Sequence, residues 1–268
     1  MLVRQMADKT QIPVVETLMA LGSMGAKHPL RLGMLGMHGN YASNMATSET
    51  DLVISLGARF DDRVTGKLSE FAKYADIIHV DIDAANIGKL VDVDYPIVGD
   101  ITEVLQVMIP QLDGVDTDRY QAWRDILKRY DELHPQSYVD SDDVIKPQWA
   151  IERIGQLVGE NAIITSDVGQ HQMWAAQHYP FDRPRQWINS GGLGTMGFGF
   201  PAALGAKKAF PDKTVINVTG DGSILMNMQE LVTAAEYKIP VINLILNNQF
   251  LGMVRQWQTF FYEKRYSE

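Results

Sequence analysis

The clearest pattern in the chain is a pair of apolar runs separated by a helical stretch. Residues 214–219 (TVINVT) and 241–246 (VINLIL) each predict a buried strand. Residues 226–239 between them carry apolar side chains at helical spacing, and Pro240 marks the end of that predicted helix. A strand, a helix and a strand in this space predict a right-handed βαβ unit with parallel, adjacent strands. Both strands should therefore end at the same edge of one sheet.

A short polar motif follows each of these strands. Gly220-Asp221-Gly222-Ser223 closes the first and Asn247-Asn248 closes the second, so Asp221 and Asn248 should lie side by side where open α/β sheets bind ligands. A carboxylate and an amide oxygen suit Mg²⁺ or Ca²⁺. Glycines let a phosphate approach the backbone, and a helix starting after Ser223 offers N–H groups. The motifs predict a Mg²⁺-bridged diphosphate site, and the alternative is a plain tight turn with an Asn-rich loop.

The rest of the C-terminal half fits the same sheet. The predicted elements are a helix at 147–158, a strand at 162–166, a helix at 172–178 and a glycine-rich loop at 191–199. Gln170 and His171 follow the strand, which suits a ligand site at the sheet edge, although His171 could instead be a surface residue at a helix start. So many glycines in one loop indicate that the backbone passes close to a ligand.

The N-terminal half alternates strands with helices. Strands are predicted at 13–18, 51–56, 77–82 and 96–98, each followed by glycine or acid near its end. The pattern predicts a mononucleotide or dinucleotide at the carboxyl edge of a parallel sheet. Asp81 and Asp83 are placed to accept hydrogen bonds from ribose hydroxyls, and Arg59 could pair with a diphosphate. No intact G-x-G-x-x-G follows a strand, so an NAD site is weakly supported.

The fold class predicted from these patterns is α/β, with two Rossmann-like parallel-sheet domains. A chain of 268 residues suits two domains. Acidic breaks at 113–118 and 140–143 divide it into a central domain at 1–112, a linker with one helix (118–133) at 113–146 and a second domain at 147–268.

Composition narrows the function classes. The net charge of −9 argues against bulk nucleic-acid binding but allows a phosphate cofactor held by Mg²⁺ and backbone N–H groups. The chain has no cysteine, so it has neither disulfides nor thiol catalysis, which fits the cytoplasm. No apolar run approaches the ~20 residues of a membrane span, and the first residues are no signal peptide.

The two motifs, with longer stretches around them, resemble a known family. GDGS followed by NN resembles the thiamine diphosphate motif of thiamine-dependent enzymes. More specific stretches resemble the catalytic large subunit of acetolactate synthase (acetohydroxyacid synthase): GMLGMHG at 33–39, GARFDDRVTG at 57–66, GTMGFGFP at 194–201, LMNMQEL at 225–231 and LGMVRQWQ at 251–258. The resemblance runs from end to end of the chain.

This resemblance implies an activity and its cofactors. The expected reaction is a thiamine-diphosphate-dependent carboligation: two pyruvates give acetolactate and CO₂, and pyruvate with 2-ketobutyrate gives acetohydroxybutyrate, in branched-chain amino acid biosynthesis. The implied cofactors are thiamine diphosphate, Mg²⁺ and FAD, and the implied partners are further copies, as a homodimer or homotetramer, and a small regulatory subunit. The alternatives are another thiamine diphosphate carboligase or decarboxylase, such as glyoxylate carboligase, or a catalytically dead assembly module.

The resemblance also assigns roles to individual residues. Thiamine diphosphate contacts are implied at Gln170, His171, Gly194, Thr195, Met196, Asp221, Gly222, Ser223, Asn248, Leu251, Gly252 and Met253. The implied Mg²⁺ ligands are the side chains of Asp221 and Asn248 and the backbone carbonyl of Phe250, and the implied substrate residues are Arg63, Met253 and Trp257. FAD contacts are implied at Thr17, Leu18, Met19, Leu35, Gly36, Met37, His38, Gly57, Arg59, Asp61, Asp81, Ile82, Asp100 and Ile101.

Some of these residues have plainer interpretations. Met196 could be an ordinary core methionine in a chain with 13 of them, and His38 could cap a loop. Asp61 and Asp62 could belong to a solvated turn.

One part of the family pattern has no counterpart in the chain. The family's first domain supplies the glutamate that activates the thiamine ring across a subunit interface, and nothing here matches it. We therefore expect no catalytic residue in this chain, no turnover by the chain alone, and two incomplete domains. The central domain would lack its first strand, and the second would be truncated at its C-terminus.

Overall fold

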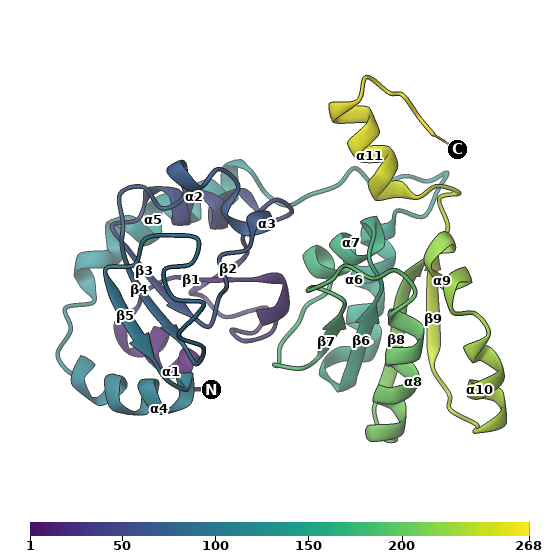
Figure 1. Cartoon of the computed structure of the whole chain (residues 1–268), viewed down its shortest axis with the longest axis horizontal. Helices are drawn as coiled ribbons and strands as arrows, with labels where there is room; N and C mark the ends of the chain where they lie inside the picture. Colours follow the sequence, from purple (N-terminus) through teal and green to yellow (C-terminus); the bar gives the residue numbers. More distant parts are fainter. Residues whose placement is uncertain (268) are drawn as a thin grey trace. The chain divides into compact units, whose positions relative to one another are not determined.

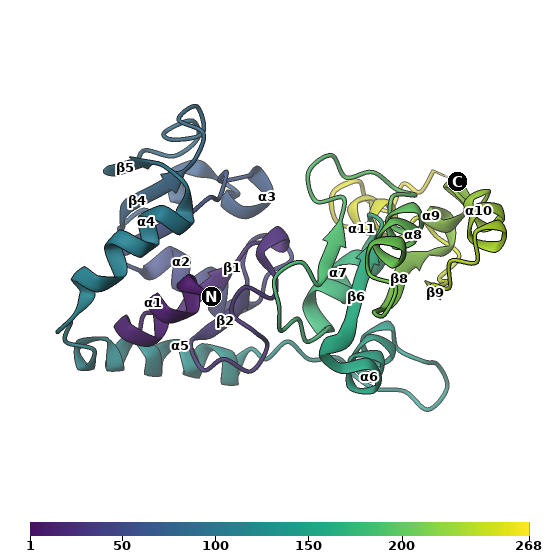
Figure 2. The same cartoon turned by 90° about the horizontal axis from the view of Figure 1, so that it is seen from below.

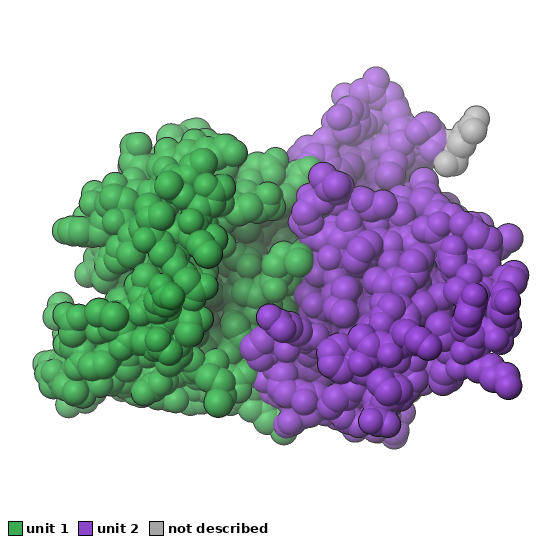
Figure 3. Space-filling model, turned by 60° about the horizontal axis from the view of Figure 1, so that its bottom comes forward, with its two compact units in different colours: residues 1–137 green, residues 138–268 purple. Residues whose placement is uncertain are grey.

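The computed structural model describes residues 1–267 (Figure 1). The chain divides into two compact units, Met1–Ser137 and Tyr138–Glu268, coloured separately in Figure 3. The boundary falls inside the segment 113–146 that the sequence suggests as a linker.

Unit 1 contains two parallel sheets. One pairs β1 (Val14–Glu16) with β2 (Arg31–Met34), and the other has the order β3 (Leu52–Leu56), β4 (Asp76–Asp81), β5 (Tyr95–Val98). Its α-helices are α1 (Leu2–Thr10), α2 (Tyr41–Glu49), α3 (Asp62–Thr65), α4 (Ile101–Met108) and α5 (Gln121–Leu133). Short 3₁₀ helices lie at Leu18–Ala20, Leu68–Glu70, Ile109–Leu112 and Asp118–Tyr120.

The prediction for unit 1 was partly wrong. The parallel strands near 51–56, 77–82 and 96–98 are confirmed, but the strand predicted at 13–18 ends at Glu16 because a 3₁₀ helix follows. The sequence did not predict α1, α2 or β2, whose short run RLGM contains a glycine. The helix expected in the linker is α5, seen in Figure 2. It packs against α2, with Leu127 buried and the Tyr130 hydroxyl donating to Glu49 over 2.9 Å.

Unit 2 is built on one four-stranded parallel sheet. Its order is β7 (Trp187–Asn189), β6 (Ala162–Ser166), β8 (Thr214–Gly220), β9 (Ile242–Leu246). Its helices are α6 (Pro147–Val158), α7 (Gln170–His178), α8 (Gly199–Ala209), α9 (Asp221–Met226), α10 (Glu230–Glu236) and α11 (Gly252–Phe261), with a 3₁₀ helix at Gly159–Asn161. The central strands are buried because α8 packs on β6 and β8 through Ala203, Ala206, Ile163 and Val215.

Two predictions for this unit are wrong. The helix expected at 226–239 is the shorter α10, and a separate helix, α9, precedes it and begins directly after β8. Asn227 breaks the helix with φ −135°, and its side chain donates to the Gly197 carbonyl over 2.8 Å. The strand expected to be buried at 241–246 is β9, which lies at the sheet edge with Ile242 52% and Ile245 46% exposed. Its apolar sequence resembles a central strand, but among the described residues only β8 pairs with it.

The parallel α/β class predicted from the sequence is confirmed in both units. All strand pairs in the described residues are parallel. Within residues 1–267, no helix is both long and apolar enough to cross a membrane.

Candidate functional site

The carboxyl edge of the unit 2 sheet brings the two predicted motifs together. β8 and β9 are adjacent and in register, with Gly220 opposite Leu246. Asp221 and Asn248 therefore follow neighbouring strands, and both line one small cavity of about 50 Å³. Of the residues implied for thiamine diphosphate or Mg²⁺, the cavity is lined by Gln170, His171, Met196, Asp221, Gly222, Ser223, Asn248, Phe250, Leu251, Gly252 and Met253. Gly194, Thr195 and Trp257 lie outside this lining.

Among the described residues that line this cavity, His171 has the most strongly shifted pKa. The residue is 6% exposed, and burial lowers the pKa of its imidazole to about 4, although the nearby Asp221 carboxylate opposes that shift. A Cβ at Gly220 would lie 2.9 Å from Nδ1 of His171, so only glycine fits at this end of β8. His171 Nε2 and Ser223 Oγ are buried and have no hydrogen-bond partner within the described chain. Two unpaired polar atoms beside a cavity suit the oxygens of a diphosphate.

A network of amide side chains connects the cavity to α11. The Asn248 oxygen accepts from the Phe250 N–H over 3.1 Å, and its nitrogen donates to Gln170 over 3.3 Å. Gln170 in turn donates to Gln256 of α11 over 3.3 Å. Figure 1 shows α11 beyond the end of β9, and none of its ten residues, all described, is buried.

Trp174 also lines the cavity, and the sequence analysis missed it. It lies in α7, three residues after His171, and helical spacing would place it on the same side of the helix.

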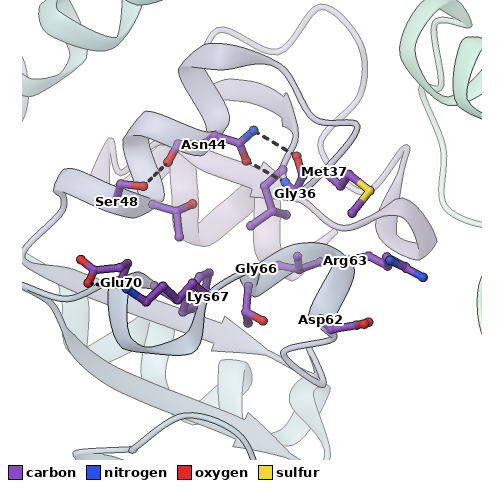
Figure 4. Close-up of a pocket in the computed structure, with 14 residues that line it drawn as sticks. Gly36, Met37, Asn44, Ser48, Asp62, Arg63, Gly66, Lys67 and Glu70 are labelled. Carbon is purple, nitrogen blue, oxygen red and sulfur yellow. Dashed lines mark hydrogen bonds and ion pairs between the residues drawn. The ribbon is translucent and has the colours of Figure 1, made fainter. Parts of the chain in front are cut away.

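Unit 1 has a larger cavity of about 410 Å³ (Figure 4). One wall is Leu35–Met37, and Arg63 lies on the opposite wall. The two walls meet where the Met37 N–H donates to the backbone carbonyl of Arg63 over 2.7 Å. Asn44 of α2 fixes the loop, since its side chain accepts from the Gly36 N–H over 2.7 Å and donates to the Gly36 carbonyl over 3.0 Å. The sequence analysis did not identify Asn44.

A second group of implied FAD residues meets at the carboxyl edge of the β3–β4–β5 sheet. The Gly57 N–H donates to Val80, and the Gly99 N–H donates to Asp81 over 3.0 Å. A Cβ at Gly57 would lie 2.9 Å from Ile101 Cδ1. The residues implied at the ends of three different strands are therefore neighbours. Asp81 is 5% exposed, and its side chain accepts from the Asp83 N–H.

The remaining implied FAD residues have local structural roles. Arg59 forms an ion pair of 3.2 Å with Asp61, which also accepts from the Arg63 N–H and caps α3. Asp100 caps α4, and its hydrogen bonds with Thr102 lower the pKa of its carboxyl. Thr17 lies at the N-cap position of the 3₁₀ helix that contains Leu18 and Met19, and Ile82 is exposed. Burial and the Arg63 charge lower the pKa of His38.

The described residues contain no group of three or more His, Cys, Asp or Glu side chains that could hold a metal ion. The set implied for Mg²⁺ is of another kind, with one carboxylate, one amide and one backbone carbonyl. Because Mg²⁺ keeps several waters and phosphate oxygens as ligands, this donor set fits it.

Comparison with known proteins gives two family matches and many relatives. Residues 2–108 match the central domain of thiamine pyrophosphate enzymes, and residues 167–268 match their C-terminal TPP binding domain. The chain is 48% identical over 269 residues to the acetolactate synthase isozyme 3 large subunit of Escherichia coli (strain K12), covering 99% of this chain and 47% of that protein. It is 50% identical over 267 residues to the Corynebacterium glutamicum acetolactate synthase large subunit, covering 98% of this chain and 43% of that protein.

The chain thus spans about half the length of the curated relatives that it matches. The two matched domains together cover most of the chain. The chain therefore belongs to the thiamine pyrophosphate enzyme family, among the homologues of the acetolactate synthase large subunit.

Proposed function

We propose that this chain contributes the Mg²⁺-thiamine diphosphate wall and the FAD-contacting domain of an acetolactate synthase. The reaction would join two 2-keto acids with loss of CO₂, giving acetolactate from two pyruvates or acetohydroxybutyrate from pyruvate and 2-ketobutyrate. One observation carries the proposal: Asp221 and Asn248 follow adjacent parallel strands and line one cavity together with the unpaired atoms His171 Nε2 and Ser223 Oγ.

Each group at this edge has a chemical task in the proposal. Asp221, Asn248 and the Phe250 carbonyl would hold Mg²⁺, and Gly222 leaves room for the diphosphate. Because a neutral imidazole carries one N–H, His171 can donate to a phosphate oxygen without adding charge. Thiamine diphosphate, when bound, supplies an electron sink for decarboxylation. The protein's part is to hold the two acids in place and exclude water.

Unit 1 would bind FAD and would supply a cationic side chain, Arg63, that binds the substrate. Support comes from the cavity beside Leu35–Met37 and from the meeting of Gly57, Asp81 and Ile101 at one sheet edge. Arg63 would pair with a substrate carboxylate, since a guanidinium binds carboxylates through two parallel hydrogen bonds. Met253 and Trp257 on α11 would line the substrate approach.

We also propose that this 268-residue chain does not turn over pyruvate alone. Among residues 1–267, Asp221 is the only acid that lines the thiamine cavity, and its role there is to hold the metal. The described lining of this cavity contains no second carboxylate that could activate the thiamine ring. The substrates, the homodimer or homotetramer, the regulatory subunit and the cytoplasmic location remain predictions.

Calorimetry with Mg²⁺-thiamine diphosphate tests the site. The parent chain should bind, and Asp221→Ala should lose most of the affinity because its metal ligand is gone. Asp212→Ala is the matched control, since it removes an exposed carboxylate of the same unit that precedes β8, at the opposite end of that strand from Asp221. Equal binding by the parent and Asp221→Ala would refute the assignment. No binding by a folded parent would favour the alternative of an assembly module without a working cofactor site.

An assay for acetolactate tests the predicted inactivity. The purified chain receives pyruvate, thiamine diphosphate, Mg²⁺ and FAD. We expect no product, and measurable acetolactate would show that another group in the chain activates the thiamine ring.

A further inference from the structure

Asp167 is a fully buried carboxylate that the proposed function does not use. It directly follows β6, at the same carboxyl edge as the thiamine cavity, and is 0% exposed. It does not line the cavity itself. Burying a carboxylate is costly unless hydrogen bonds compensate for the lost water, so its partners indicate what it does.

Those partners come from two separate segments of the site. Asp167 Oδ1 accepts from the N–H of Gly199, the first residue of α8, over 2.6 Å, and the Gly197 N–H also donates to the carboxylate. Asp167 Oδ2 accepts from the Thr219 hydroxyl at the end of β8. Gly197 directly follows Met196, and Thr219 lies two residues before Asp221. One carboxylate therefore joins the loop that carries Met196 to the strand that carries the metal ligand.

The glycine segment is tightly enclosed at this point. A Cβ at Gly199 would lie 2.8 Å from the Asp167 backbone nitrogen and 2.4 Å from Asn217 Oδ1. Gly197 has φ +80°, and its carbonyl accepts from Asn227 on the other side. Burial raises the pKa of the Asp167 carboxyl, while its three donors oppose that shift.

The loop also approaches the diphosphate turn directly. A Cβ at Gly222 would lie 3.9 Å from the Met196 methyl carbon, so the two walls of the cavity are in close contact. A small displacement of the glycine segment would therefore change the width of the cavity between Met196 and Gly222.

We propose that Asp167 is a positioning residue that fixes the segment 197–199, and Met196 with it, against the end of β8. This inference rests on the proposed thiamine diphosphate function. Met196 would contact the cofactor rings, whereas the Asp221 turn would contact the diphosphate. Loss of Asp167 should therefore weaken binding of the whole cofactor more than binding of its diphosphate part. The Asp221 turn keeps its own support, because β8 pairs with β6 and β9.

The experiment compares two ligands, Mg²⁺-thiamine diphosphate and Mg²⁺-pyrophosphate, by calorimetry on the 268-residue chain. Asp167→Ala should lose about tenfold in affinity for the first ligand and less than about threefold for the second, a typical effect of leaving buried donors unpaired. Asp167→Asn keeps one acceptor oxygen for Gly199 and should keep the affinity ratio within about threefold of the parent. Asp212→Ala is again the control, and circular dichroism verifies folding.

An equal loss for both ligands, or none, would overturn the inference while leaving the proposed function intact. If Asp167→Ala does not fold, Thr219→Val replaces it, since it removes the hydroxyl that links β8 to the carboxylate, and the same ratio must fall. Binding of neither ligand by the parent would refute the proposed function. In that case, amide hydrogen exchange still tests whether Asp167 fixes the segment 197–199. The N–H groups of Gly197 and Gly199 should be protected from exchange in the parent and in Asp167→Asn, and unprotected exchange in the parent would overturn the inference.

Discussion

Gly199 should be the least replaceable glycine of α8. A methyl group there would lie 2.8 Å from the Asp167 backbone nitrogen and 2.9 Å from the Ser166 carbonyl carbon, in addition to the side-chain oxygen of Asn217. Backbone atoms of a buried strand end cannot move aside, so Gly199→Ala must displace α8 from β6. Overpacking of this kind costs about 1–3 kcal/mol, and we expect a loss of about 2 kcal/mol in the free energy of unfolding.

The same helix provides a matched control. Gly205 is exposed, and a methyl group there would meet nothing within 4 Å. Because alanine is the better helix former, Gly205→Ala should stabilise the chain by about 0.5–1 kcal/mol. The two substitutions are chemically identical and should have opposite signs, separated by about 3 kcal/mol when the loss from overpacking and the helical gain are combined.

Urea unfolding followed by tryptophan fluorescence measures this difference. Of the 5 tryptophans only Trp123 lies in unit 1, so the signal reports mainly on unit 2. A Gly199→Ala variant as stable as the parent, or a Gly205→Ala variant destabilised to the same extent as Gly199→Ala, would contradict this prediction.

Three further predictions concern single side chains. Burial lowers the pKa of His171 from 6.5 to about 4, so the unfolded chain binds more protons between these values and stability should rise by about 3 kcal/mol as the pH rises through them. Urea unfolding at several pH values should show this rise in the parent, and an equal rise in His171→Gln would contradict it. Asn40→Ala should cost about 1 kcal/mol because its oxygen caps α2 at the Ser43 N–H over 2.7 Å, whereas Asn40→Ser, whose hydroxyl can accept from the same N–H, should cost less; urea unfolding followed by circular dichroism, which also reports on unit 1, measures both. Ile164→Ala, at 0% exposure, should cost about 2–4 kcal/mol in urea unfolding, and a similar loss in Ile245→Ala, at 46% exposure, would contradict the burial argument.

Local patterns predicted much of the fold. The β-branched runs identified β6 and β8 and the position of β9, and the proline in the first turn identified α6. These elements depend on side-chain spacing over a few residues. The patterns failed where a distant residue decides the backbone, as at Asn227, whose bond to the Gly197 carbonyl accompanies the break between α9 and α10. They also failed for β9, since a sequence does not show whether a strand has one neighbour or two.

The candidate site shows the same division. The sequence placed Asp221 and Asn248 at one edge because parallel adjacent strands must end on the same side of a sheet. The specific role of each residue came from the family resemblance. In unit 1, Gly57 and Asp81 lie at the same edge of the β3–β4–β5 sheet, as the strand pattern predicted.

By itself, the sequence determined the parallel α/β class, the strand ends that carry the motifs and the donor types suited to Mg²⁺. Only the tertiary structure decided that His171 Nε2 and Ser223 Oγ are buried without partners, that Asn44 holds the Leu35–Met37 loop and that Asp167 joins two segments. The physical reason is range. Spacing along the chain reports which face a residue occupies, whereas burial and hydrogen-bond partners depend on segments that are far apart in sequence and meet only after folding.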